Sequence, residues 1–241
     1  MSETIELPDE LPDASAGFFG KVTSNGDFVS RRLPASFKQP WDEWLQHGMQ
    51  GSRSALEDAW LDTYLSSPIW RFALAPGVCD ANSWAGILMP SVDRVGRHFP
   101  LTIAAGVEGE VTLLDWVENA ASWYDRLEEL ALESLREDFS LDALDAALLQ
   151  TAPPSQAADP VQNQSSGIRL PIAGLAALPD AMPGIIRQIA GAALAGHGLW
   201  WTEGSTQVEP SLLMCKGLPS HLSFTAMLDG LWAQGGWQSG N

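Results

Sequence analysis

Apolar residues recur along the chain with two periods, and each period predicts one kind of element. Short apolar runs bounded by turn residues predict strands over Phe18–Thr23, Ile69–Leu74, Trp84–Met89 and Leu101–Ala105. Phe28–Arg32 is either a further strand or a short turn. Spacings of three and four residues predict helices from Pro40 onward and over Ser54–Leu65, Asp115–Leu135 and Leu141–Leu149. Ser140 is placed to cap the last of these helices.

Residues 151–167 interrupt this pattern. They have no period and are rich in Pro, Ser, Gln and Ala, which predicts a linker or a disordered loop. After it, the pattern predicts a helix over Pro183–Ala195, strands over Gly198–Glu203 and Ser211–Lys216, and a helix near Ser220–Trp232. The chain therefore divides into a flexible acidic arm (1–15), a core (16–150), the linker (151–167) and a smaller unit (168–241).

The order of these elements indicates the fold class. Strands joined by short turns and followed by helices predict an α+β fold, a mostly antiparallel sheet covered by helices. Two strands alone are marginally stable, so the smaller C-terminal α/β unit is expected to extend the same sheet. Four aromatic residues are expected in the core, namely Trp60, Trp70, Trp84 and Phe99.

The charge of the chain is strongly negative, −17 from 30 acidic and 13 basic residues. Nucleic acids and anionic membrane surfaces attract Lys/Arg patches, so neither is an expected partner. Eight of the basic residues lie before residue 100, whereas residues 115–145 contain ten acidic residues and only two arginines. Such a dipolar chain favours a protein partner of complementary charge.

Compartment and cofactors follow from what the sequence lacks. Met1–Leu11 is acidic, without the positive start and apolar core of a signal peptide, and no apolar run reaches the ~18 residues of a membrane helix. Cys79 and Cys215 imply no disulfide framework, and the four histidines show no metal-ligand spacing. We expect a cytoplasmic protein without membrane insertion, metal or cofactor.

The polar segment between Trp84–Met89 and Leu101–Ala105 is the first candidate for a site. Ser91 and Asp93 are suited to hold a turn, and Gly96 tolerates the positive φ that a reversal of the loop needs. Arg94, Arg97 and His98 lie on the same loop, where binding groups are often displayed. Alternatively, Asp93 pairs with an arginine and staples the hairpin, and the chemistry slightly favours this structural role.

Ser91, Asp93 and His98 also allow a hydrolase hypothesis. A serine nucleophile needs a histidine, a third orienting group and an oxyanion hole. The chain has no Gly-x-Ser-x-Gly elbow, and one short loop rarely supplies all these parts. We therefore expect no catalytic residues here.

Three sequence blocks carry a resemblance to a known family. They are PSVDRVGRHFPLT (Pro90–Thr102), GFFGKVTSNGDFVSRRLP (Gly17–Pro34) and SPIWRFAL (Ser67–Leu74). Together they resemble the TagF (ImpM) family, accessory proteins of the bacterial type VI secretion system. The second half is similar more weakly, mainly in LWWTEGS (Leu199–Ser205).

The resemblance implies a non-enzymatic, cytoplasmic, post-translational negative regulator of the secretion system. Relatives work through the system's forkhead-associated scaffold protein, which this chain is expected to bind and sequester. This regulator has two alternatives: the hydrolase described above, and a structural component of the secretion assembly. The candidate residues, for binding the partner or for stapling the motifs, are Lys21, Asp27, Arg31, Ser91, Asp93, Arg94 and Arg97.

Two of these blocks place charge in a turn beside an apolar strand. Unpaired charges near a core are costly. We therefore expect Asp27, Arg94 and Arg97 to converge, with the Asp27 carboxylate accepting from an arginine. In that arrangement, at least one arginine is a staple.

Overall fold

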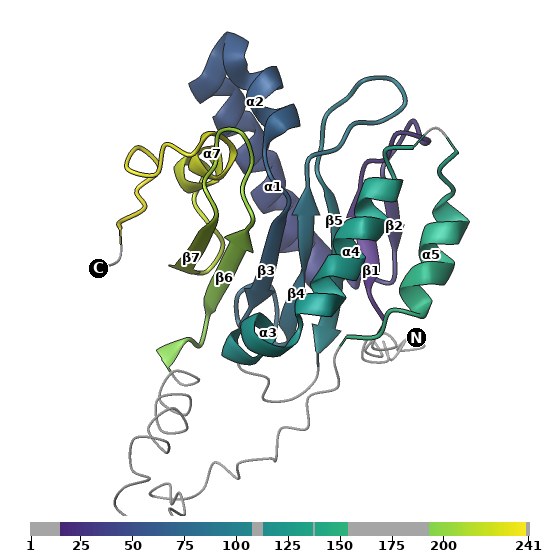
Figure 1. The fold of residues 1–241 in the computed structure, drawn as a ribbon. Helices are drawn as coiled ribbons and strands as arrows, with labels where there is room; N and C mark the ends of the chain where they lie inside the picture. Colours follow the sequence, from purple (N-terminus) through teal and green to yellow (C-terminus); the bar gives the residue numbers. More distant parts are fainter. Residues whose placement is uncertain (1–14, 108–112, 137, 154–192, 240–241) are drawn as a thin grey trace, which may run out of the picture.

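The apolar runs predicted as strands pair in one antiparallel sheet (Figure 1). A computed structural model describes residues 15–107, 113–136, 138–153 and 193–239. The sheet has seven strands in the order β2-β1-β5-β4-β3-β6-β7. Their bounds are Gly17–Gly20 (β1), Val29–Arg31 (β2), Trp70–Leu74 (β3), Ser83–Met89 (β4), Leu101–Val107 (β5), His197–Thr202 (β6) and Ser211–Lys216 (β7). The predicted α+β class is confirmed.

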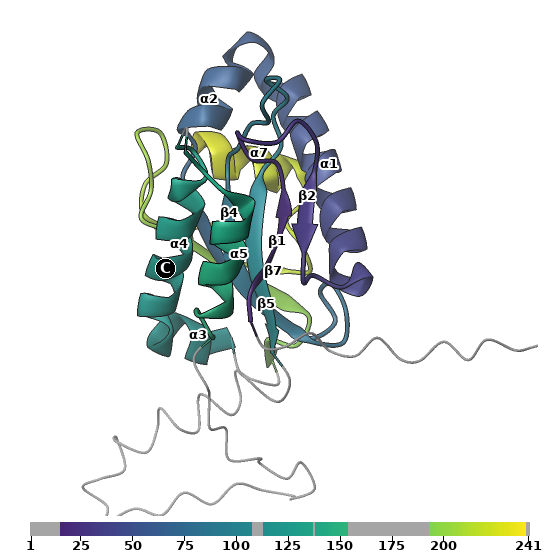
Figure 2. The same cartoon turned by 90° about the vertical axis from the view of Figure 1, so that its right-hand side faces the viewer.

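Helices cover both faces of the sheet (Figure 2). One face carries α1 (Ala35–Leu56), α2 (Trp60–Ser66) and α7 (His221–Asp229). The opposite face carries α3 (Leu113–Asn119), α4 (Ala121–Glu133) and α5 (Leu141–Leu149). Because helices cover both faces of the central strands, β3 and β4 are buried along their whole length.

Aromatic side chains fill the core between the sheet and α1. Trp41 stacks between Phe37 and Trp200, and its Nε1 donates to Thr102 Oγ1 at 2.8 Å. The core on the other face combines mainly aliphatic strand residues with Trp116, Trp123 and Tyr124 of α3 and α4. The expectation of burial is confirmed for Trp60, Trp70, Trp84 and Phe99, all less than 9% exposed.

The C-terminal strands extend the same sheet, as expected. Phe72 of β3 pairs with Trp200 of β6, and β6 pairs with β7. Trp200 is buried on the α1 face, whereas the adjacent Trp201 is half-buried on the α4 face. The predicted helix Pro183–Ala195 and the predicted linker fall mostly outside the described residues, and the proposed domain boundaries remain a prediction.

Three predicted helices begin elsewhere or are divided. In the predicted helix Ser54–Leu65, the first three residues end α1, Glu57–Ala59 form a 3₁₀ turn, and α2 begins at Trp60. Helix α1 begins at Ala35, although Pro40 then lies inside it and cannot donate its backbone hydrogen bond. Phe37 and Trp41, one turn apart, are fully buried, so packing on the sheet outweighs the cost of the proline. The predicted helix Asp115–Leu135 is divided at Ala120 into α3 and α4.

An arginine of the sheet anchors the acidic helix α4. Arg71 of β3 is largely buried, and its guanidinium lies 2.6 Å from Glu128 and 2.7 Å from Asp125. Both carboxylates belong to α4. Arg71 therefore neutralises part of the negative charge of α4 from the sheet side. The acidic residues of this helix are not only a solvated face.

Candidate functional site: two loops joined by a buried ion pair

The loop between β4 and β5 (90–100) and the turn between β1 and β2 (21–28) are neighbours at one end of the sheet (Figure 1). Phe19 of β1 pairs with Thr102 of β5, which brings the end of β1 beside Pro100. Gly20 has a φ of +137°, and a Cβ there would lie 2.1 Å from the Pro100 carbonyl oxygen. Only glycine fits this approach.

Asp93 organises the loop 90–100 from inside. Its Oδ1 accepts the backbone N–H groups of Val95 at 3.0 Å and Arg97 at 2.8 Å. Gly96 has a φ of +86°, as the reversal of the loop requires. Asp93 thus folds the loop back on itself, with Val92 bridging to His98.

A buried ion pair joins this loop to the end of β1. Lys21 Nζ lies 2.7 Å from Asp93 Oδ2, and the two side chains are 6% and 0% exposed. Arg97 Nε lies 2.7 Å from the same oxygen. Burial raises the pKa of Asp93, but the hydrogen bonds from Lys21, Arg97 and Val95 outweigh it and hold the pKa well below its usual range. The carboxylate is therefore ionised at neutral pH.

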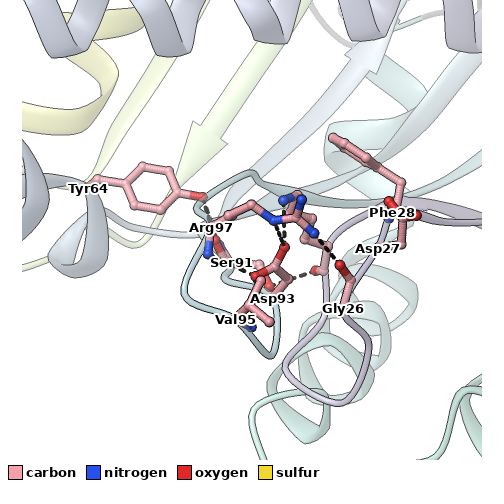
Figure 3. A network of polar contacts seen from close by, with 9 residues as sticks. Gly26, Asp27, Phe28, Tyr64, Ser91, Asp93, Val95 and Arg97 are labelled. Carbon is pink, nitrogen blue, oxygen red and sulfur yellow. Dashed lines mark hydrogen bonds and ion pairs between the residues drawn. The ribbon is translucent and has the colours of Figure 1, made fainter.

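Arg97 extends this network to the neighbouring turn. Its Nη2 donates to the Gly26 carbonyl oxygen, so the guanidinium lies between the two loops (Figure 3). The backbone N–H of Arg94 donates to the Asn25 carbonyl oxygen at 3.0 Å. The two sequence blocks therefore converge, and Arg97 acts as a staple.

The prediction that the Asp27 carboxylate accepts a hydrogen bond from an arginine is wrong. Its Oδ1 accepts the N–H of Phe28 at 2.9 Å, and within the described residues no arginine pairs with it. Asp93 is the carboxylate that serves Arg97, because the folded loop brings these residues, four apart in sequence, into direct contact. Asp27 instead stabilises its own turn.

Ser91 of the loop supports the same junction and is itself held by Tyr64 of α2. Its Oγ donates to the Lys21 carbonyl oxygen at 2.7 Å. Its backbone N–H and C=O both bond to the hydroxyl of Tyr64 at 2.9 Å. Ser91 is buried and its hydrogen-bonding groups are satisfied, so its role is to position the loop.

The hydrolase geometry is not formed by the three residues that suggested it. The Ser91 hydroxyl donates its hydrogen bond to the Lys21 carbonyl oxygen. The described contacts include no hydrogen bond from His98 to Ser91 or Asp93. The His98 ring packs edge-on against Trp60 and Tyr64. A serine nucleophile needs a hydrogen-bonded chain through its histidine, which this arrangement does not provide.

Above the buried network, four side chains face solvent: Phe28, Arg94, Val95 and Arg97, here called the loop surface. Phe28 is 47% exposed although its ring packs on Phe19 and Phe99, and Val95 is 65% exposed. The Arg94 guanidinium extends over Gly26 and forms no ion pair within the described residues. Sequence reasoning missed Phe28 and Val95, whose only signal was their position beside the charged turn residues.

Arg31, another candidate, belongs to a different cluster. It pairs with Asp142 and Asp145 of α5 at 2.9 Å each, and Arg32 also pairs with Asp145. These contacts attach α5 to the edge of the sheet at β2. Arg31 is therefore a structural contact of α5 and not part of the loop surface.

Comparison with known proteins agrees with this arrangement. The family model described as TagF N-terminal domain, type VI secretion system-associated, matches residues 17–151, more than half of the chain. The chain belongs to the TagF family. Its motif blocks Gly17–Pro34 and Pro90–Thr102 both lie within the match, and they build the buried network.

A solved structure also resembles this TagF chain over most of its length. The crystal structure of PA0076 from Pseudomonas aeruginosa PAO1 has 37% sequence identity and a TM-score of 0.76. The alignment covers 90% of this chain and 94% of that one. The similarity therefore extends beyond the family match into the C-terminal strands. No curated protein matches the chain.

No described helix is long and apolar enough to cross a membrane. No three His, Cys, Asp or Glu side chains gather within the described part of the chain as a metal site would need.

Proposed function

We propose that this TagF-family protein is a non-enzymatic, cytoplasmic accessory protein that negatively regulates the type VI secretion system after translation. It does so by binding and sequestering the system's forkhead-associated scaffold protein. Membership of the TagF family supports the link to the secretion system. The observation that carries the binding proposal is the loop surface, in which a buried network displays Arg94, which has no ion pair among the described residues, beside exposed apolar side chains.

The buried and exposed members of the network have different roles in this proposal. Lys21 and Asp93 are almost inaccessible, so they fix the shape of the two loops without touching a partner. Arg94 and Phe28 are accessible, and arginine and aromatic residues are enriched among the side chains that contribute most to binding. The partner surface is expected to supply carboxylates for Arg94 and an apolar recess for Phe28.

The charge of the chain favours such an encounter. The total charge is −17, yet Arg94 and Arg97 extend from one end of the molecule. A positive patch on a negative protein orients an acidic partner surface toward that patch and disfavours other approaches. The proposed binding is therefore expected to weaken as salt screens these charges.

Replacing Arg94 by glutamate tests the proposal. Arg94 is exposed and has no described ion pair, so the melting temperature should stay within about 2 °C of wild type. Capture of the purified scaffold should fall at least ~10-fold, the effect of losing one important contact. Arg126→Glu is the matched control, because it makes the same charge change at an exposed site on α4.

Two results would speak against the proposal. The first is an Arg94→Glu chain that captures the scaffold as well as wild type does. The second is stoichiometric retention of the chain in purified, assembled secretion complexes, which would favour a structural component over a sequestering regulator.

A further inference from the structure

Strand β7 presents an unusual edge to solvent. It is the last strand of the sheet, and no described strand pairs with its outer side (Figure 1). It has six residues, and Leu212 and Met214 are 62% and 56% exposed. The opposite edge strand, β2, has three residues and is attached to α5 by ion pairs of Arg31. A long apolar edge strand tends to pair with a further strand, whereas a short charged one does not.

The register places the exposed side chains of β7 on one face. Leu212 pairs with Trp201, and Met214 pairs with Leu199, which belongs to the core under α4. Leu213 lies opposite Trp200 in the core under α1. Leu212 and Met214 therefore extend the apolar surface of the α4 side of the sheet to its outer edge.

We propose that β7 pairs antiparallel with β7 of a second copy of this chain, which joins the two sheets across a two-fold axis. An axis perpendicular to the sheet keeps each side chain on its own face, so the residues that pair must be an even number apart. Centred on Leu213, the pairing places Leu212 opposite Met214 of the second copy, and the reverse. In this register, Leu212 and Met214 of each copy are partly covered by Met214 and Leu212 of the other.

The ends of the strand are complementary in the same register. Lys216 comes opposite Pro210 of the second copy. Glu209 precedes Pro210 outside the strand, where the pleat does not fix the direction of its side chain, so the long Lys216 side chain can reach its carboxylate. An antiparallel pair therefore has two such Lys–Glu contacts, whereas a parallel pair would place like charges together. The net charge of −17 on each copy opposes association. Because one strand pair is a small interface, the dissociation constant should be on the order of micromolar.

Sedimentation velocity of the full chain over a concentration series tests the proposal. Wild type should shift from monomer to dimer as concentration rises. The double variant Leu212→Lys with Met214→Lys should remain monomeric with an unchanged melting temperature, because both side chains are exposed. This variant lowers the net negative charge of each copy, so a loss of the dimer reflects the lysines placed opposite each other in the strand pair and not repulsion between the whole chains. Leu61→Lys with Leu65→Lys, two exposed positions on α2, is the matched control and should still dimerise.

Cross-linking tests the register separately. In a Cys79→Ser, Cys215→Ser background, a mixture of Leu212→Cys and Met214→Cys chains should cross-link faster than either chain alone. A wild-type chain that is monomeric at every concentration would overturn the proposal, since the patch is then covered by the same chain or by another protein. A Lys double variant that dimerises like wild type would overturn it too.

Discussion

Trp70→Ala is expected to lower the free energy of unfolding by about 3–5 kcal/mol. The indole is 2% exposed, and its Nε1 donates to the Met227 carbonyl oxygen at 3.1 Å. The substitution leaves a cavity between β3 and α7 and removes a hydrogen bond to a buried carbonyl. Chemical denaturation followed by circular dichroism measures the change.

The control for this prediction is Leu231→Ala, close to α7 in sequence but 49% exposed, which should change stability by no more than ~0.5 kcal/mol. Trp70 and Met227 come from the two halves of the chain, so both halves should unfold in one transition. Two transitions, with Trp70→Ala affecting only one, would contradict this account of the sheet.

Asp93→Asn should destabilise the chain more than any other isosteric change at the loops. It removes the charge that faces Lys21 and Arg97 but keeps the shape of the side chain. The buried Lys21 ammonium then lacks its counter-ion, and the melting temperature should fall by roughly 5–15 °C. Adding Lys21→Met should recover part of the loss, because no buried charge then remains unpaired.

The matched control is Asp142→Asn, whose carboxylate is 87% exposed and also pairs with an arginine. An exposed pair contributes little, so the melting temperature should hardly change. If Asp93→Asn and Asp142→Asn had the same melting temperature, the buried ion pair would not be what stabilises the two loops.

The effect of Asp93 should also depend on pH in a defined direction. The pKa of Asp93 is lower in the folded chain than the ~3.9 of an unfolded aspartate. Its contribution to stability is therefore complete above about pH 4 and is lost as the pH falls toward the lower, folded pKa. The difference in melting temperature between wild type and Asp93→Asn should narrow below about pH 4. A difference that widens on acidification would contradict the lowered pKa.

The strands were predictable because they combine apolar side chains with clear boundaries. Ser211–Lys216 was predicted with the bounds that β7 has, and Ser140 accepts the N–H of Ala143 as the predicted N-cap. The start of α1 was not predictable from local signals. Pro40 marks a helix boundary in sequence, and only the burial of Phe37 and Trp41 against the sheet outweighs it.

The candidate site was predicted in part, for a similar reason. Local turn chemistry identified the loop 90–100, and Arg97 is a staple as expected. The burial of Lys21 was not foreseen, because it depends on the pairing of β1 with β5, strands far apart in sequence. The same long-range pairing gives the Lys21 ammonium the Asp93 carboxylate as its acceptor and leaves Asp27 to its own turn.

Hydrogen–deuterium exchange of the chain, alone and with the purified forkhead-associated scaffold, tests the central claim most directly. Binding through the loop surface should slow exchange of the amides in residues 26–28 and 94–97, and the Arg94→Glu chain should show no such slowing at the same scaffold concentration. Unchanged exchange in both segments, with slower exchange over the acidic helix α4, would contradict the account.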